Sequence, residues 1–388
     1  MPFDMSQVQR GARLRRTPFF EATQRHGARG YTVYNHMLFP IGFADLEEEY
    51  WHLVNHVTLW DVSVERQVEI TGPDAFTFTN MLTPRDLSRC AVGQGKYVAI
   101  TAEDGGVVND PVLLRLGENH FWLALADSDV LLWARGAALN SGLRVTITEP
   151  DVSPLQIQGP KATEVVRSLF GDGVLGLRYY WFLETALDGI PVVVTRTGWS
   201  GEVGFEVYLR DGSRGDELWE RIMAAGRPHQ IRPTGPSDIR RVEAGILNWG
   251  ADMTLADNVF EAGLEWLIDE DKGADYIGRD ALRRIRAEGV RRRLVGVEIA
   301  GDRLEFNPVR WAVRAGGRPA GYVTSAIWSP RLEKNIGYAM VPVEHAAAGS
   351  RLEVEVPGAG ARDATVVPKP FVDPKKAIPK SRLTPTAV

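Results

Sequence analysis

An aspartate directly after a predicted hairpin is the first residue with the means to do chemistry. Residues 103–106 read Glu-Asp-Gly-Gly, the composition of a tight turn, and the strand that follows carries Asp110 and then Pro111. Because proline has no N–H group, the hydrogen-bond ladder is interrupted beside the carboxylate. An acid set among apolar residues must either face water or line a cavity. In a cavity it could orient a ligand and take up a proton; the alternative is a solvated aspartate at a sheet edge.

A second segment, residues 196–208, combines a tryptophan, a carboxylate and a tyrosine around a glycine-rich loop. Trp199 lies in the loop, and Glu206 and Tyr208 follow at two-residue spacing on the strand that resumes after it. Aromatic rings can stack on a flat heterocycle while a carboxylate accepts paired N–H bonds from its edge. The segment therefore indicates a site for a hydrogen-bonding heterocycle. A glycine-rich hairpin with an aromatic residue packed on it is the alternative interpretation.

Other patterns that would indicate a reaction class are absent from the sequence. There is neither a P-loop for phosphates nor a dinucleotide-binding glycine motif after a strand. Residues 198–201, Gly-Trp-Ser-Gly, differ from the nucleophile elbow because the second glycine comes one place early. His52 and His56 lie four residues apart on a predicted helix over residues 43–57, but no third ligand accompanies them. We therefore predict no metal site and expect these histidines to have local partners.

The elements that would position these residues show an internal repeat. Residues 155–160, Leu-Gln-Ile-Gln-Gly-Pro, repeat the arrangement of residues 68–73, Val-Glu-Ile-Thr-Gly-Pro, and a helical pattern follows each. The two glycines, Gly72 and Gly159, are 87 residues apart. A duplicated α/β unit of that length would place a ligand cleft between two related halves. Chance recurrence of a strand–Gly-Pro–helix junction is the alternative.

The chain changes character from residue 291. Short strand-like runs alternate with turn signals such as Gly316-Gly317 and Pro357-Gly358, which is the pattern of an all-β domain. Residues after 371 contain prolines and basic residues without apolar periodicity. We therefore predict an α+β fold with two related, intertwined α/β halves over residues 1–290, an all-β domain over 291–371 and an extended tail over 372–388.

Composition limits the class of protein and its partners. With 388 residues, 44% hydrophobic and 24% charged, the chain has the balance of a soluble globular enzyme of two or three domains. Its formal net charge of -5 argues against a nucleic-acid partner. Its single cysteine, Cys90, favours the cytoplasm and excludes an iron–sulfur cluster built by this chain alone. No apolar run approaches the ~20 residues of a membrane span, and no apolar secretory stretch follows the first arginines, such as Arg10.

These segments, together with several others, resemble the aminomethyltransferase superfamily, which includes the glycine-cleavage T-protein and the folate-dependent demethylases. The resemblance extends over nearly the whole chain and is carried by Asn109-Asp110-Pro111, residues 196–208, Arg241-Val242-Glu243-Ala244-Gly245, Trp249-Gly250, residues 260–264, residues 276–279, Ser329-Pro330 and Pro370-Phe371. The N-terminal part is most similar to the tetrahydrofolate-dependent dimethylsulfoniopropionate demethylases, over residues 13–18, 31–38, 60–62, 65–70 and 126–129.

The resemblance implies a fold, a co-substrate and roles for individual residues. The fold would be a three-domain ring with a C-terminal β-barrel, and tetrahydrofolate would lie in its central channel. Asp110 would be the catalytic carboxylate near N5 of the pterin, and Glu206 would bind the donor edge of the pterin. The implied reaction is methyl transfer from a small onium substrate, such as dimethylsulfoniopropionate, to N5 of tetrahydrofolate. The remaining pocket residues would be Trp199, Tyr208, Tyr97 and Tyr180, with the donor cation held over aromatic faces such as those of Trp199 and Trp181.

The sequence also departs from both branches of the superfamily. Asn109-Asp110 stands where glycine-cleavage members carry two aspartates, and Ser237 aligns with one of their arginines. Residues 201–203, Gly-Glu-Val, are closer to the glycine-cleavage form than to the Lys-Gln-Gly run of the demethylases. Three alternatives stay open: aminomethyl transfer of the glycine-cleavage type, demethylation of another N- or O-methylated small molecule, and folate binding without turnover. We expect a small-molecule methyl donor as partner, with no nucleic acid or membrane, and leave a homo-oligomer open.

Overall fold

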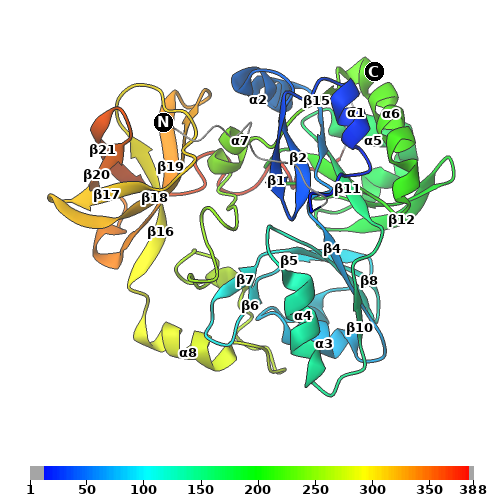
Figure 1. Ribbon diagram of the computed structural model, residues 1–388, viewed down its shortest axis with the longest axis horizontal. Helices are drawn as coiled ribbons and strands as arrows, with labels where there is room; N and C mark the ends of the chain where they lie inside the picture. Colours follow the sequence, from blue (N-terminus) through cyan, green and yellow to red (C-terminus); the bar gives the residue numbers. More distant parts are fainter. Residues whose placement is uncertain (1–12, 384–388) are drawn as a thin grey trace.

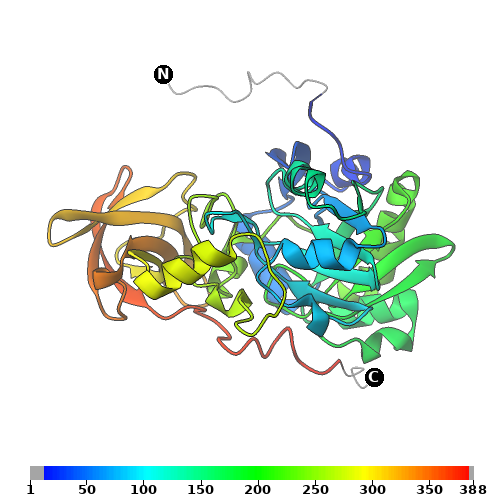
Figure 2. The same cartoon turned by 90° about the horizontal axis from the view of Figure 1, so that it is seen from below.

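The computed structural model describes residues 13–383, which form three lobes around a common centre (Figures 1 and 2). Two lobes, coloured blue to green, are α/β halves, and the third is a β-barrel reached through helix α8 (Arg279–Glu288). The predicted α+β fold class is confirmed. The segment around Arg10, considered above for a targeting signal, lies outside the described residues, as do residues 384–388 of the predicted tail. Within the described part of the chain, no helix is long and apolar enough to cross a membrane.

The first half is built on a five-stranded sheet. Its elements are β4 (Gln67–Thr71), α3 (Ala75–Met81), β5 (Gln94–Tyr97), β6 (Ile100–Thr101), β7 (Val107–Asn109), β8 (Val112–Gly117), β9 (His120–Ala124), α4 (Val130–Leu139) and β10 (Thr146–Thr148). The sheet order is β10-β4-β9-β8-β5, and α3 and α4 supply Phe78 and Ala134 to the core beside it. The turn predicted over residues 103–106 joins β6 to β7, which form a separate two-stranded sheet.

The second half repeats this plan on a six-stranded sheet. Its elements are β11 (Ser153–Gln158), α5 (Ala162–Phe170), β12 (Phe182–Leu187), β13 (Ile190–Thr195), β14 (Gly204–Leu209), α6 (Gly215–Gly226) and β15 (Arg232–Pro233). The sheet order is β12-β13-β14-β11-β3-β15, so β3 (Thr58–Asp61), from the N-terminal part of the chain, lies between β11 and β15. In both halves a strand leads through a helix to an antiparallel hairpin whose second strand pairs with the first, and then to another helix. The insertion of β3 interlocks the two halves.

Gly72 and Gly159 occupy the same place in the two halves, directly after β4 and β11. Both have positive φ, +119° and +126°, a conformation that side chains rarely adopt. A Cβ atom would lie 2.6 Å from the carbonyl oxygen of Arg144 at Gly72, and 2.5 Å from that of His56 at Gly159. The repeated Gly-Pro motif therefore reflects the same backbone requirement in both halves. In each half the chain turns sharply after the strand and passes close to a neighbouring carbonyl group.

The substitution Gly159→Ala is expected to lower the free energy of unfolding by at least about 1 kcal/mol. The alanine must adopt a positive φ, and its Cβ must also displace the carbonyl of His56. Urea denaturation would measure the loss. Gly189→Ala is the matched control, because Gly189 has a φ of +82° but a Cβ atom added there would meet no other atom within 4 Å. Equal losses in the two variants would show that steric contact at Gly159 contributes nothing.

The N-terminal elements precede this repeat and pack against the second half. They are α1 (Phe20–Arg25), β1 (Gly30–Tyr34), β2 (Met37–Gly42) and α2 (Leu46–Asn55). Helix α2 is shorter than the predicted range of 43–57, because the side chain of Asp45 caps its first turn by accepting from the N–H groups of Glu47 and Glu48. His52 contacts the carbonyl of Gln230 at 2.7 Å, and His56 contacts Nζ of Lys161 at 2.9 Å, so both histidines have local partners as predicted.

The C-terminal lobe is a closed barrel. Its strands are β16 (Arg292–Ile299), β17 (Trp311–Ala315), β18 (Arg318–Ser329), β19 (Lys334–Pro342), β20 (Arg351–Val356) and β21 (Gly360–Val367), paired in the order β16-β19-β18-β17-β20-β21. Alternate apolar side chains of these strands, such as Val297, Val323 and Val354, fill the interior. The structure therefore contains the β-barrel that the resemblance implied.

A buried ion pair joins the barrel to the α/β region through α7 (Asp238–Glu243). Nη1 of Arg241 lies 2.9 Å from Oδ2 of Asp252, and both side chains are fully buried. The hydroxyls of Thr324 and Ser325, on barrel strand β18, donate to the other oxygen of Asp252 at 2.7 and 2.6 Å. Because every charged atom in this cluster has a partner, the contact fixes the position of the barrel.

The tail crosses from the barrel to the second half, as the red segment of Figure 2 shows. Its described part, up to residue 383, contains neither helix nor strand. The N–H groups of Phe371 and Val372 donate to the carbonyl of Glu243, both at 2.9 Å. Farther along, the guanidinium of Arg196 donates to the carbonyls of Pro379, at 3.0 Å, and Ser381. These contacts attach the tail to Glu243 of α7 and to Arg196, which precedes the loop that contains Trp199.

Candidate functional site

Asp110 lies between β7 and β8 and faces the end of β5. Its Oδ2 accepts a 2.7 Å hydrogen bond from the hydroxyl of Tyr97, which pairs with Val112 across the β5–β8 ladder. Burial raises the pKa of Asp110 to about 7, and the hydrogen bond from Tyr97 acts in the opposite direction. A half-buried carboxyl with a pKa near neutrality can exchange a proton under physiological conditions. The interpretation of Asp110 as a solvated edge residue is therefore wrong.

Asn109, beside it, is a fully buried structural residue. Its amide nitrogen donates to the carbonyl of Ala126 at 3.1 Å and to the hydroxyl of Ser128 at 2.8 Å, while its amide oxygen accepts from the N–H of Ala126. A carboxylate could make only the last of these bonds as an acceptor. The asparagine in this position thus anchors the loop after β9 and contributes no second acid beside Asp110.

Glu206 lies on β14 and is 3% exposed. Its Oε1 accepts from the side-chain amide of Gln156, its partner on β11, at 2.8 Å. Its Oε2 accepts from the hydroxyls of Thr197, at 2.6 Å, and Tyr208, at 2.8 Å. Burial raises the pKa of Glu206, and these hydrogen bonds oppose the rise. Because a carboxylate has about four acceptor positions, Oε1 retains one for a ligand N–H group.

The tyrosines predicted for the site differ in their burial and in the groups that they contact. Tyr208 is 0% exposed, so it acts on the site through its hydrogen bond to Glu206. Tyr180 has a φ of +64°, and its carbonyl accepts from Gly95 on β5 at 2.7 Å. Its ring lies edge-on to that of Tyr179, with 4.7 Å between centroids, and its hydroxyl lies near enough to Tyr97 to raise the pKa of that phenol.

The two tryptophans considered for a donor cation have different surroundings. Trp199 is half-buried and packs with Phe39 against Trp60 of β3. Trp181 is covered by a cation of this chain, since the guanidinium carbon of Arg178 lies 3.9 Å from its ring centroid. Trp181 is therefore a poor surface for a second cation.

A third carboxylate, Glu65, reaches the same region and was not found from the sequence. It lies in the turn between β3 and β4. Burial raises the pKa of Glu65 well above its usual value, and the charges of Glu206 and Asp110 add to the rise. Asp110 and Glu206 therefore both lie within electrostatic reach of Glu65, although the three acids come from three distant parts of the chain. The sequence does not indicate that Glu65 lies near the other acids, because Glu65 is a turn residue before a strand and its position relative to them depends on how the two sheets pack.

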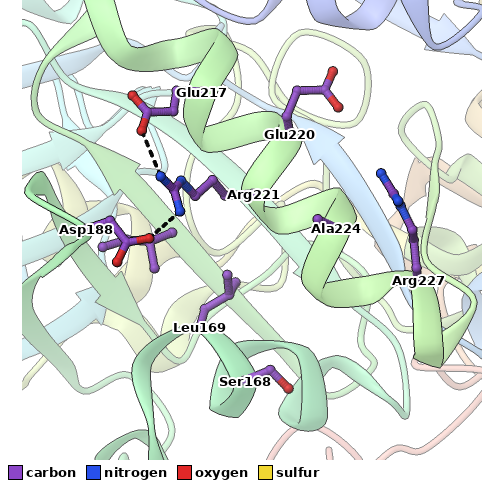
Figure 3. A pocket seen from close by; sticks show the side chains of 9 residues that line it. Ser168, Leu169, Asp188, Glu217, Glu220, Arg221, Ala224 and Arg227 are labelled. Atoms are coloured by element: carbon purple, nitrogen blue, oxygen red, sulfur yellow. Dashed lines mark hydrogen bonds and ion pairs between the residues drawn. The ribbon is translucent and has the colours of Figure 1, made fainter.

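A surface groove on the second half lies away from these residues (Figure 3). It runs between α5 and α6, and Arg221 there contacts both Glu217 and Asp188. Glu220 is paired with His26 and Arg25 at its rim. Its acidic side chains are thus satisfied by the protein itself, and no residue singled out in the sequence lines it.

Comparison with known proteins assigns the family. The family model of the GCVT N-terminal domain matches residues 19–272, and that of the glycine cleavage T-protein C-terminal barrel domain matches residues 292–373. The chain belongs to the glycine-cleavage T-protein family. This family consists of folate-dependent transferases with tetrahydrofolate as co-substrate, so the resemblance seen in the sequence is confirmed.

The relatives of this T-protein family member are named for two different activities. Dimethylsulfoniopropionate demethylase DmdA of Ruegeria pomeroyi is 41% identical over 93% of this chain and 98% of its own length. An aminomethyltransferase of Shouchella clausii is 34% identical over 92% and 98%. The crystal structure of the glycine cleavage system aminomethyltransferase T of Bartonella henselae superposes with a TM-score of 0.84, at 24% identity over 93% of this chain and 98% of that one. The last comparison supports the fold.

Proposed function

We propose that this protein transfers a methyl group from a small onium compound, such as dimethylsulfoniopropionate, to N5 of tetrahydrofolate. The observation that carries the proposal is Asp110, a half-buried carboxyl with a pKa of about 7 that, like the hydrogen-bonding Glu206, lies within electrostatic reach of Glu65. The 41% identity to a protein named as a dimethylsulfoniopropionate demethylase supports the choice of donor. The lone, buried Cys90 supports the cytoplasm as the place of reaction.

The residues present fit a tetrahydrofolate molecule. Glu206 retains an acceptor position on Oε1, which suits the N–H groups along one edge of a pterin. Thr197, Tyr208 and Gln156 hold its carboxylate in a single orientation through their hydrogen bonds. Asp110, from the other half, would then face the reacting nitrogen. Two carboxylates from different halves would thus fix one flat ring at both ends.

The proposed reaction requires the protein to align the methyl donor with the acceptor nitrogen and to remove one proton. The bond between the methyl carbon and the sulfonium sulfur breaks, the electron pair stays on sulfur, and a neutral thioether leaves. N5 forms the new bond to carbon and loses its proton to the carboxylate of Asp110. Holding donor and acceptor in line in a water-poor site can contribute several kcal/mol to the rate.

Product analysis with purified protein tests the proposal. Incubation with tetrahydrofolate and dimethylsulfoniopropionate is expected to yield 5-methyltetrahydrofolate and the demethylated thioether in equal amounts. A panel that includes a betaine and a methoxy compound would show which methyl donors are accepted. Absence of 5-methyltetrahydrofolate with every sulfonium donor would overturn the proposal.

Aminomethyl transfer of the glycine-cleavage type is the second candidate, favoured by relatives such as the 34% identical aminomethyltransferase. Against it stands Ser237, which replaces an arginine of the glycine-cleavage members and serves here as the N-cap of α7, where its hydroxyl accepts from the N–H of Arg240 at 3.3 Å. Formation of methylenetetrahydrofolate would identify this reaction. Tetrahydrofolate binding without any product would favour the remaining alternative, a non-catalytic folate-binding protein.

The substitution Tyr97→Phe is expected to move the pH profile of kcat/KM to higher pH by about one unit. Asp110 must be ionised to accept a proton, so kcat/KM rises as the pH passes its pKa of about 7. The hydrogen bond from Tyr97 stabilises the carboxylate, and its loss raises the pKa. Profiles of the wild type and of Tyr322→Phe, a barrel variant, provide the controls. An unchanged inflection in Tyr97→Phe would show that Asp110 does not set the profile.

A further inference from the structure

The carboxylate of Glu65 is an acid that the proposed methyl transfer does not use. It lies in the turn after β3, and the backbone on both sides is held: the N–H of Glu65 donates to the carbonyl of Val62 at 2.9 Å, and its carbonyl accepts from the side chain of Gln67 at 2.5 Å. Within residues 13–383, no hydrogen bond or ion pair reaches the carboxylate itself. Fully buried acids are almost never unpaired, and burial already raises the pKa of this half-buried carboxyl group, so a cationic partner would stabilise its ionised form.

An aromatic surface lies beside this carboxylate. Burial raises the pKa of the Tyr34 phenol well above its usual value, and the nearby charges of Glu65 and Asp110 add to the rise. Its ring meets that of Phe39 at 5.9 Å between centroids, and both rings are half-buried. Asn35, with a φ of 47°, fixes the turn: its N–H donates to Asp127 at 2.7 Å, and its side chain donates to the carbonyl of Val64, next to Glu65, at 2.9 Å. Tyr34 is thereby held against the Glu65 turn.

The acids of this region have raised pKa values and no cationic partner among the described residues. The charges of Asp110 and Glu206 act on Glu65, and no arginine or lysine of residues 13–383 forms an ion pair with any of the three carboxylates. Arg241 approaches the nearby Trp199, at 5.5 Å from the ring centroid, but it is paired with Asp238 and Asp252. A ligand that brings a positive charge would lower these pKa values and bind to the carboxylates in their ionised form, whereas a neutral or anionic group would not stabilise that form.

We infer that Glu65, together with the faces of Tyr34 and Phe39, binds the positive centre of the methyl donor and selects cationic donors over neutral ones. This inference rests on the proposed methyl transfer and names the substrate class that the same site accepts. A sulfonium or quaternary ammonium centre has no N–H to donate, so it is recognised by aromatic faces and by a nearby carboxylate without a hydrogen bond. That is the combination found here: an acid without a hydrogen-bond partner among the described residues, beside two half-buried rings.

The affinities of a sulfonium compound and of its isostere with an uncharged CH group in place of the sulfonium sulfur test the inference. Dimethylsulfoniopropionate and 4-methylpentanoate have the same shape, but only the first carries the sulfonium charge. Calorimetric titration of each into the protein without tetrahydrofolate, so that no methyl group can be transferred, gives the ratio of their dissociation constants. The wild type is expected to favour the cation, and Glu65→Gln is expected to reduce that preference by about 10- to 100-fold. Glu65→Asp should retain part of it, and Glu103→Gln, at an exposed turn, should leave it unchanged.

Tyr34→Leu and Tyr34→Phe give a second, independent measurement should Glu65→Gln fold poorly. The leucine removes the aromatic face and should reduce the preference for the cation, whereas the phenylalanine retains the face and the preference. An unchanged ratio of dissociation constants in folded Glu65→Gln, or equal ratios in the two Tyr34 variants, would overturn the inference. Because binding is measured without turnover, failure to form 5-methyltetrahydrofolate would count against the proposed function alone.

Discussion

The substitution Asp110→Asn is expected to lower kcat for methyl transfer by about 10²- to 10⁴-fold, the usual contribution of a positioned general base. The asparagine keeps the shape of the side chain and can still contact the hydroxyl of Tyr97, but it cannot take up the proton released when N5 is alkylated. Formation of 5-methyltetrahydrofolate under saturating substrates measures the change. The affinity for tetrahydrofolate should change far less than kcat, because Asp110 acts mainly on the reacting nitrogen.

Protein stability separates this loss of activity from misfolding. The pKa of Asp110 is raised in the folded protein, to about 7 from its ordinary 3.8, so ionisation costs stability as the pH rises from about 4 to 7. Asp110→Asn removes that cost, and the variant should be no less stable than the wild type above pH 7. Asp129→Asn, at an exposed helix start, is the matched control for activity. Full activity in Asp110→Asn would remove the carboxylate from the mechanism.

The substitution Glu206→Gln is expected to weaken tetrahydrofolate binding by about 10²-fold or more, because hydrogen bonds to a charged group contribute about 1.5–3 kcal/mol each. The amide offers one acceptor oxygen where the carboxylate offers two, and its NH₂ group meets the donor hydroxyls of Thr197 and Tyr208 or the donor edge of the ligand. Calorimetric titration with tetrahydrofolate would measure the loss.

A matched surface variant and the kinetic pattern check this result. Glu184→Gln lies on β12 of the same sheet, where its partner is Arg210 at the surface, and it should bind tetrahydrofolate as the wild type does. In Glu206→Gln, KM for tetrahydrofolate should rise with a smaller change in kcat. An unchanged dissociation constant would exclude Glu206 from ligand recognition.

The internal repeat could be predicted from the sequence because it depends on local backbone rules. A strand that must leave its sheet sharply needs a glycine with positive φ, and a proline then suits the start of the following helix. Gly72 and Gly159 carry that signal at the same place in the two halves.

The neighbours of the acids could not be predicted, because they come from distant segments. Gln156 meets Glu206 only because β11 and β14 pair in one register, and Tyr97 meets Asp110 only through the pairing of β5 with β8. The two-residue spacing predicts that Tyr208 lies on the same face of the strand as Glu206. It does not predict that Tyr208 is buried, because that burial depends on the packing of Trp122 from the other sheet.

The sequence by itself therefore determined the fold class, the doubled α/β plan, the barrel and two of the acids, because each follows from local spacing or from a specific motif. Only the tertiary structure decided that Asp110 has a pKa near 7, that Glu206 is held by four donors, and that Glu65 lies near both without a hydrogen-bond partner in the described part of the chain. The physical reason is that burial and charge–charge effects act through space, between side chains that the chain order keeps far apart.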